Sequence, residues 1–102
     1  MVNDVSDMSV SRAEVTTAKA SGYLQQLCKH FGHKLPVSFD PAQGRIEFQG
    51  GVCDLDATVP GVLGLRVSAA GASERERLEQ VVASHLVRFA FREDLAVEWQ
   101  PA

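Results

Sequence analysis

The chain has 102 residues, enough for one domain with a single hydrophobic core but not for a core and a large internal cavity. Apolar residues make up 45% and charged residues 23%, the balance of an ordinary water-soluble globular protein. The formal net charge of −3 argues against nucleic acid or an anionic membrane as the main partner, because both require a basic surface. No stretch has the apolar length that is needed to span a bilayer.

The polar residues 1–10 predict a flexible tail, and residues 11–102 predict a single α+β domain. Acidic residues occupy the start of the chain, where a signal peptide needs basic residues and then an apolar run. We therefore expect a cytoplasmic protein. Cys28 and Cys53 do not form a Cys-x-x-Cys motif, so we expect free thiols in that reducing compartment.

The first two predicted elements are a strand and a helix. Alternating apolar and polar residues over 11–17 predict a half-buried strand. Helical spacing over residues 20–31 predicts a helix, with Ser21 as a suitable N-cap and Gly32 as a natural C′ residue. The apolar face of this helix consists of Leu24, Leu27, Cys28 and Phe31.

Four short strands are expected next, at residues 35–40, 45–49, 52–59 and 62–69. Turns are predicted at residues 40–44, at Gly50-Gly51 and at Pro60-Gly61. The side chains expected to point inward from these strands are Val37, Phe39, Ile46, Phe48, Cys53, Leu55, Ala57, Val59, Leu63, Leu65 and Val67.

A long helix is predicted over residues 73–93. Ser73 and Glu76 have the spacing of a capping box at its start. Its apolar stripe consists of Leu78, Val81, Val82, Leu86 and Phe89. A final strand is expected over residues 95–100, with inward side chains at Leu95, Val97 and Trp99.

Every predicted strand has one apolar face, and each helix has one apolar stripe. These patterns predict an α+β fold, a single mostly antiparallel sheet of about six strands with both helices packed on one face. The expected order is strand, helix, four strands, helix, strand. The opposite face is mixed in charge, which is typical of a solvated surface but would also suit a dimer or partner interface. It should carry Arg12, Glu14, Ser38, Arg45, Glu47, Asp54, Asp56, Arg66 and Glu98.

One group of candidate site residues lies at the end of the first helix. His30 and His33 are three residues apart, a spacing at which two imidazoles on one side of a helix could share a metal or a haem. The alternative is that Lys29, His30, His33 and Lys34 occur there because cations are favoured at a helix C-terminus. We take all four as candidate ligand-binding residues, and His30 and His33 as candidate metal ligands.

The second group lies on the long helix. His85, Arg88 and Arg92 follow one another at i, i+3 and i+7 along one edge of the apolar stripe. The two arginines could hold a carboxylate or a phosphate, and such an edge is a common lining of small ligand sites. In the alternative interpretation, His85 is a core residue bonded to a strand carbonyl or an acid, and the arginines pair with Glu93 and strand carboxylates.

Three parts of the chain together resemble the bacterial family called domain of unknown function 2218: residues 23–34 with 37–40, residues 44–48, and residues 85–93 with 97–99. The most specific parts are Lys-His-Phe-Gly-His-Lys at 29–34 and Arg-Phe-Ala-Phe-Arg-Glu at 88–93. The family pattern maps onto His30, His33, Lys34, His85, Arg88, Phe89, Arg92 and Glu93. The resemblance implies no established activity. It implies an accessory module that accompanies siderophore-interacting flavoproteins, and hence a link to iron or siderophore metabolism.

The leading prediction is a small bacterial module that binds a ligand or accompanies another protein without catalysing a reaction. Its expected partner is a small anionic ligand or a siderophore-interacting flavoprotein, and it would be a monomer or a homodimer. One alternative is a small enzyme in which His30 or His85 acts as general acid–base, although no nucleophile motif accompanies them. Another alternative is a protein that binds a metal or haem. No particular cofactor is indicated.

Overall fold

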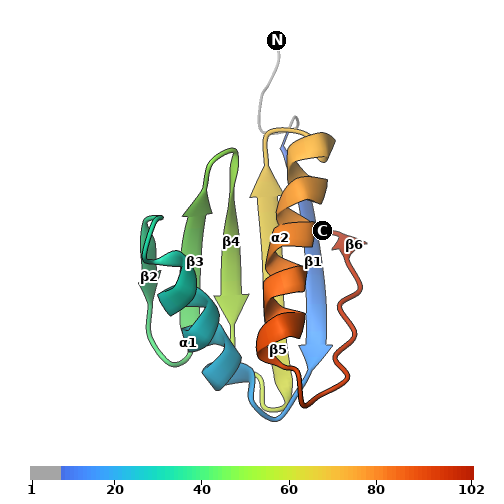
Figure 1. Cartoon of the computed structure of the whole chain (residues 1–102). Helices are drawn as coiled ribbons and strands as arrows, with labels where there is room; N and C mark the ends of the chain where they lie inside the picture. Colours follow the sequence, from blue (N-terminus) through green and yellow to red (C-terminus); the bar gives the residue numbers. More distant parts are fainter. Residues whose placement is uncertain (1–7) are drawn as a thin grey trace.

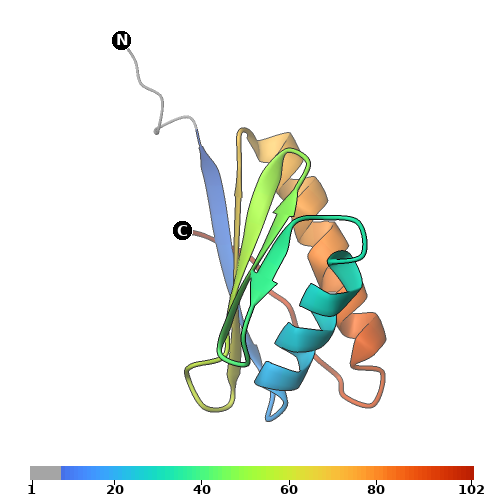
Figure 2. The same ribbon diagram turned by 90° about the vertical axis from the view of Figure 1, so that its left-hand side faces the viewer.

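A computed structural model describes residues 8–102 as a six-stranded antiparallel sheet with two helices on one face (Figures 1 and 2). In chain order the elements are β1 (Ser9–Thr16), α1 (Ala20–Phe31), β2 (Val37–Phe39), β3 (Gln43–Phe48), β4 (Gly51–Asp56), β5 (Val62–Ala69), α2 (Ala72–Phe89) and β6 (Gln100–Pro101). The strand order across the sheet is β2-β3-β4-β5-β1-β6. The predicted α+β fold and its order of elements are confirmed.

β1 lies beside β5, a strand that is distant from it in the sequence. The two strands pair along the whole length of β1, from Ser9 opposite Ala69 to Thr16 opposite Val62. Ser9 and Val10 therefore belong to the first strand and not to the predicted tail. The rest of that predicted tail, residues 1–7, lies outside the described residues. Within residues 8–102, neither helix combines the length and apolar character that a membrane span requires.

The core lies between the helices and the sheet face that they cover. α1 lies mainly over β3 and β2, while α2 lies over β5, β4 and β1 (Figure 1). Burial of a large apolar side chain contributes about 1.5 to 3 kcal/mol, so these two helix faces account for much of the stability. The predicted faces are confirmed by the fully buried side chains Leu24, Leu27, Cys28, Leu78, Val82 and Leu86.

The helix ends differ from their predicted caps. α1 has the predicted bounds, but Lys19 precedes it as N-cap, and the Ser21 hydroxyl donates to the Pro41 carbonyl at 2.6 Å. Gly32 keeps a right-handed helical backbone with φ of −63°, so it is not the left-handed C′ residue that was expected. A Cβ at Gly32 would lie 2.9 Å from the Cys28 carbonyl oxygen, which is a packing reason for glycine there.

α2 begins at Ala72 and has no side-chain cap, so the predicted capping box of Ser73 and Glu76 is wrong. The helix also ends at Phe89, four residues before the predicted end at Glu93. The amide of Glu93 donates to the Ala90 carbonyl at 2.9 Å, which turns the chain back toward the edge of the sheet. Residues 90–93 therefore form a turn and not the last turn of the helix, although their sequence has helical periodicity.

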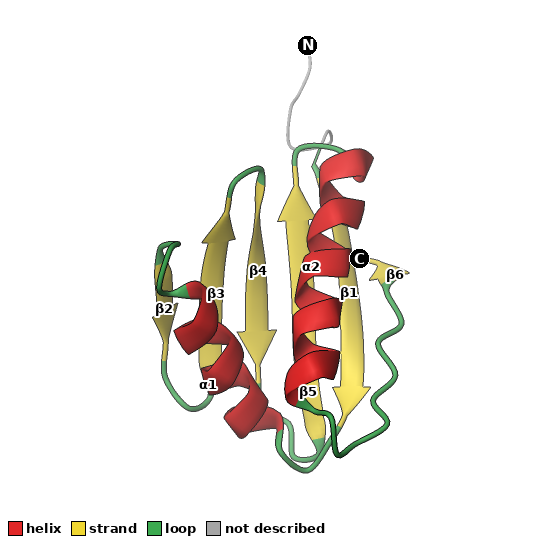
Figure 3. Ribbon diagram, in the orientation of Figure 1, coloured by secondary structure: helices red, strands yellow, loops and turns green. Residues whose placement is uncertain are grey.

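The predicted last strand over residues 95–100 is mostly a loop, drawn green between α2 and β6 in Figure 3. Its inward residues were predicted correctly, because Leu95, Val97 and Trp99 pack against the core without pairing as a strand. Two other inward predictions are wrong. Val59 is 57% exposed because β4 ends before it, and Phe39 is 39% exposed at the end of the edge strand.

The three predicted turns are present. Asp40 Oδ1 accepts from the amides of Ala42 and Gln43, which fixes the turn before β3. Gly61 has φ of +79° between Pro60 and Val62, as a type II turn requires. The β3–β4 hairpin turns one residue earlier than expected, at Gln49-Gly50, where Gly50 has φ of +94°.

The buried polar side chains of β1 and of the residue that follows it, Ser11 and Thr17, receive acidic partners from α2 and the loop after it. Ser11 donates to Glu79 Oε2 at 2.5 Å, and Thr17 donates to Glu93 Oε1 at 3.0 Å. The Tyr23 hydroxyl of α1 donates to the other oxygen of Glu93. Glu93 thus ties together the end of β1, the start of α1 and the loop after α2. We call Thr17, Tyr23 and Glu93 the Glu93 clamp.

The Glu93 clamp predicts the effect of removing the Tyr23 hydroxyl. The hydrogen bond from Tyr23 is the main reason that the pKa of Glu93 is lowered, so Tyr23→Phe should raise the pKa of this carboxyl. Loss of this hydrogen bond should also lower the free energy of unfolding. Carboxyl NMR and urea denaturation would measure the two effects. An unchanged pKa of Glu93 in Tyr23→Phe would contradict the clamp.

Candidate functional site

The two predicted groups of site residues meet in space. The last turn of α1 places His30 beside His85 of α2, with 5.0 Å between the ring centroids. Phe31 lies 4.8 Å from His85, and Phe89 lies 5.5 Å from His30. We call His30, Phe31, His85 and Phe89 the histidine cluster.

The core holds these rings in place. Phe31 and Phe89 are half-buried and pack against the core, and Phe31 also contacts Phe48 of β3 with 5.1 Å between centroids. His85 is half-buried on the α2 stripe, while His30 is exposed on α1. The cluster is therefore a surface site with an aromatic floor, one side of which is open to solvent.

The hydrogen bond of His85 fixes its tautomer. Its Nδ1 lies 2.7 Å from the carbonyl oxygen of Val81, one turn earlier on the same helix. A carbonyl can only accept, so Nδ1 carries the proton, and the neutral ring has its lone pair at Nε2. The partner is thus neither a strand carbonyl nor an acid, the two partners considered for a core histidine. Nε2 can take up a proton and then donate to a ligand.

Positive charge gathers around His30. Its pKa is lowered, first by partial burial and then by three basic neighbours, His85, His33 and Arg88. In residues 8–102, the ion pairs within 4.0 Å involve the arginines Arg12, Arg45, Arg75 and Arg77.

Lys29 and Lys34 flank His30 and His33 at the end of α1, and Arg88 adds a third permanent cation from α2. None of the three forms an ion pair in the described part of the chain. A group of bases without acidic counterparts attracts anions. This arrangement could bind a carboxylate or a phosphate.

Arg92 does not extend the predicted edge of His85 and Arg88. Because α2 ends at Phe89, Arg92 lies in the following turn and not at the helical i+7 position. Its guanidinium carbon lies 5.5 Å from the centroid of Phe91, whose ring is 77% exposed. The edge that was predicted to hold an anion therefore ends at Arg88.

The described residues include no group of three or more His, Cys, Asp or Glu side chains placed to hold a metal ion. His30 has its ring contact with His85, whereas the predicted metal pair was His30 and His33. Two imidazoles would supply only part of the three or four ligands that a zinc site uses. Cys28 and Cys53 are free and buried, and burial raises the pKa of Cys28 to about 11.

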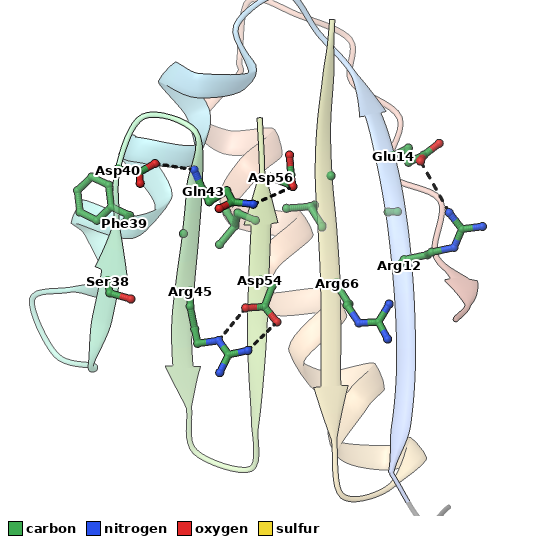
Figure 4. Close-up of a pocket in the computed structure, with 15 residues that line it drawn as sticks. Arg12, Glu14, Ser38, Phe39, Asp40, Gln43, Arg45, Asp54, Asp56 and Arg66 are labelled. Carbon is green, nitrogen blue, oxygen red and sulfur yellow. Dashed lines mark hydrogen bonds and ion pairs between the residues drawn. The ribbon is translucent and has the colours of Figure 1, made fainter. Parts of the chain in front are cut away.

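A second surface feature lies on the open face of the sheet, where an open depression of about 840 Å³ crosses β3, β4, β5 and β1 (Figure 4). Arg45 donates to both oxygens of Asp54 there, at 2.7 and 3.3 Å. The sequence predicted this charged face but not a depression. Its signal in the sequence is Gly64, which leaves an outward position of β5 without a side chain.

Comparisons with known proteins show the family of this chain and a solved structure with the same fold. A family model described as an uncharacterised protein conserved in bacteria, domain of unknown function 2218, matches residues 12–100, so the predicted resemblance is confirmed. The chain is also similar to the NMR structure of PA4090 from Pseudomonas aeruginosa, with 36% identity and a TM-score of 0.77. That similarity covers 92% of this chain and 97% of the other. No curated protein shows significant similarity.

The surroundings of His30 predict how stability depends on pH. Its pKa in the folded protein is below the ordinary value of 6.5, so the unfolded chain takes up a proton first as the pH falls. The stability that depends on neutral His30 is complete above pH 6.5 and is lost as the pH falls through the lowered pKa. His30→Gln should remove this loss.

Urea midpoints at about pH 7.5 and 5.5 would measure the loss, with His33→Gln as the matched control. The control should retain most of the decrease in midpoint. If His30→Gln and the control show the same decrease, His30 is not the group responsible.

Proposed function

We propose that this chain, which belongs to the bacterial family called domain of unknown function 2218, is a non-catalytic module that binds a small oxyanion at the histidine cluster. The ligand class is a carboxylate or a phosphate. The observation that supports it is the convergence of bases from two helices, which form no ion pair with an acidic side chain of residues 8–102. An anion would neutralise charges that the described residues leave unpaired.

Each base would have a definite role. Arg88 has a planar guanidinium, which can donate two parallel hydrogen bonds to a carboxylate or phosphate. His85 would donate from Nε2 once it is protonated, because Val81 already holds Nδ1. Lys29 and Lys34 would contribute long-range attraction at the rim. The apolar faces of Phe31 and Phe89 would exclude water from one side of the ligand.

His30 makes binding depend on pH. The positive neighbours lower its pKa in the free protein, and a bound anion would raise that pKa again. Binding is then coupled to proton uptake, so the affinity should increase as the pH falls from neutrality through the pKa of free His30. A site made only of Lys and Arg would not show this dependence.

Acid–base catalysis by His85 is a second candidate, and one observation favours it. The hydrogen bond to Val81 fixes the tautomer and leaves Nε2 available to accept a proton, as a general base requires. The cytoplasmic location and the association with siderophore-interacting flavoproteins remain predictions from the sequence. Neither depends on the geometry of the histidine cluster.

We expect inorganic phosphate or citrate to cause saturable NMR shifts at His30, His85 and the Arg88 side chain. Arg88→Ala removes a charge-assisted hydrogen bond and should weaken binding by about 10- to 100-fold. Arg77→Ala is the matched control, because it removes the same charge from the other end of α2, where Arg77 pairs with Glu74. With sulfate, an oxyanion whose charge is constant over this range, binding should be tighter at about pH 5.5 than at about pH 7.5.

Two results would reject the proposal. One is the absence of saturable shifts with either anion. The other is an equal loss of affinity in Arg88→Ala and Arg77→Ala, which would show that only the net charge matters. Both variants should keep the melting temperature of the natural chain, because both side chains are exposed.

A further inference from the structure

The strand register arranges the open face of the sheet in two neighbouring rows of residues (Figure 4). The first row is rich in arginine, and the second row has carboxylates on either side of a glycine. The arginine row consists of Ser38, Arg45, Asp54, Arg66, Arg12 and Gln100. The glycine row consists of Gln43, Asp56, Gly64 and Glu14.

The fold does not require glycine at position 64. Its backbone is not in the left-handed region, since the described glycines with positive φ are Gly50 and Gly61. A Cβ at Gly64 would make only ordinary contacts of 3.6 Å with Asp56. Glycine inside a strand weakens it, and often marks a place where another group approaches the backbone closely. Here it leaves a gap in the glycine row, with Asp56 on one side and Glu14 on the other.

The charges beside this gap are incompletely paired. Arg66 forms no ion pair within 4.0 Å in residues 8–102, and its neighbours across the strands are Asp54, already paired with Arg45, and another arginine, Arg12. Like charges on directly opposed residues destabilise a sheet. Asp56 accepts hydrogen bonds from Thr58 and Gln43, which lower its pKa, and it forms no ion pair with residues 8–102.

We propose that the open sheet faces of two copies of this chain pack together, with Arg66 of each copy entering the gap at Gly64 of the other. A twofold axis parallel to the sheet and perpendicular to the strands, passing over Leu65, exchanges positions 64 and 66 of β5. In the same operation, positions 12 and 14 of β1 exchange, because Ala13 lies opposite Leu65. Facing sheets lie about 10 Å apart with interdigitating side chains, a distance suited to an arginine that fills a gap.

The charges on the two copies are complementary in this arrangement. Arg66 would lie between Asp56 and Glu14 of the second copy, and Arg12 would face Glu14 of the second copy. Asp54 would approach Asp56 of the second copy, but each of these carboxylates then has an arginine beside it. The interface would be polar and largely electrostatic, so the dimer should weaken as the salt concentration rises. This inference does not depend on the histidine cluster, which lies on the helical side of the sheet.

Sedimentation equilibrium of the full chain would test the dimer, from micromolar to millimolar protein at about 0.05 and 0.5 M salt. We expect a dimer that is at least about tenfold weaker at the higher salt. Gly64→Val should fill the gap and weaken the dimer at least about tenfold, while the preference of valine for strands should leave the melting temperature unchanged or higher. Arg77→Ala, on α2, is the control and should dimerise like the natural chain.

A mixing experiment separates the proposed contact from general charge effects. Arg66→Glu and Asp56→Lys should each be monomeric alone, because each loses the cross-copy attraction. An equimolar mixture should form a heterodimer, since the new glutamate of one chain meets the new lysine of the other. A natural chain that stays monomeric at millimolar concentration would overturn the proposal. A dimer that is unaffected by Gly64→Val, or failure of the mixture to associate, would also overturn it.

Discussion

Both helices bury their apolar stripes against the same face of the sheet, and the other features of the molecule follow from this constraint. Leu24 and Leu27 of α1 and Val82 and Leu86 of α2 are fully buried there. An antiparallel sheet can leave its second face in water, so the opposite side of each strand is free to carry charge. The histidine cluster and the charged open face are the two surfaces that result.

The position of the histidine cluster follows from the packing of the two helices. Residues next to a buried stripe lie at the border between core and solvent, and His30 and His85 occupy this border on neighbouring helices. The Glu93 clamp holds α1 against the loop after α2, so the two helices cannot separate easily. His30, His85 and Arg88 therefore lie on helices and not on loops, which suits a binding site because helices hold side chains more precisely.

Periodicity predicted the elements and their buried faces well, because both depend on local sequence. The bounds of α1 and β5 agree with the expected ranges, and so do the inward residues of both. The contact between His30 and His85 could not be found in this way. Periodicity assigns each residue to a face of its own helix, but it does not show where two helices approach each other.

Several errors arose where tertiary contacts override local preferences. Residues 90–93 have helical spacing, but the chain turns at Ala90, and Glu93 binds Tyr23 instead of extending the helix. For the same reason, Arg92 does not continue the edge formed by His85 and Arg88. Gly64 was visible in the sequence, but its role depends on its neighbours on β4 and β1, which only the strand register reveals.

The most direct test of the central claim, that two helices bring His30 and His85 into one cationic cluster, is long-range proton–nitrogen NMR of the imidazoles across pH. The account predicts that neutral His85 carries its proton on Nδ1. It also predicts a pKa of His30 below 6.5 that moves toward 6.5 in His85→Gln, because a basic neighbour is removed. A proton on Nε2 of His85, together with a pKa of His30 that is unchanged in His85→Gln, would contradict the account.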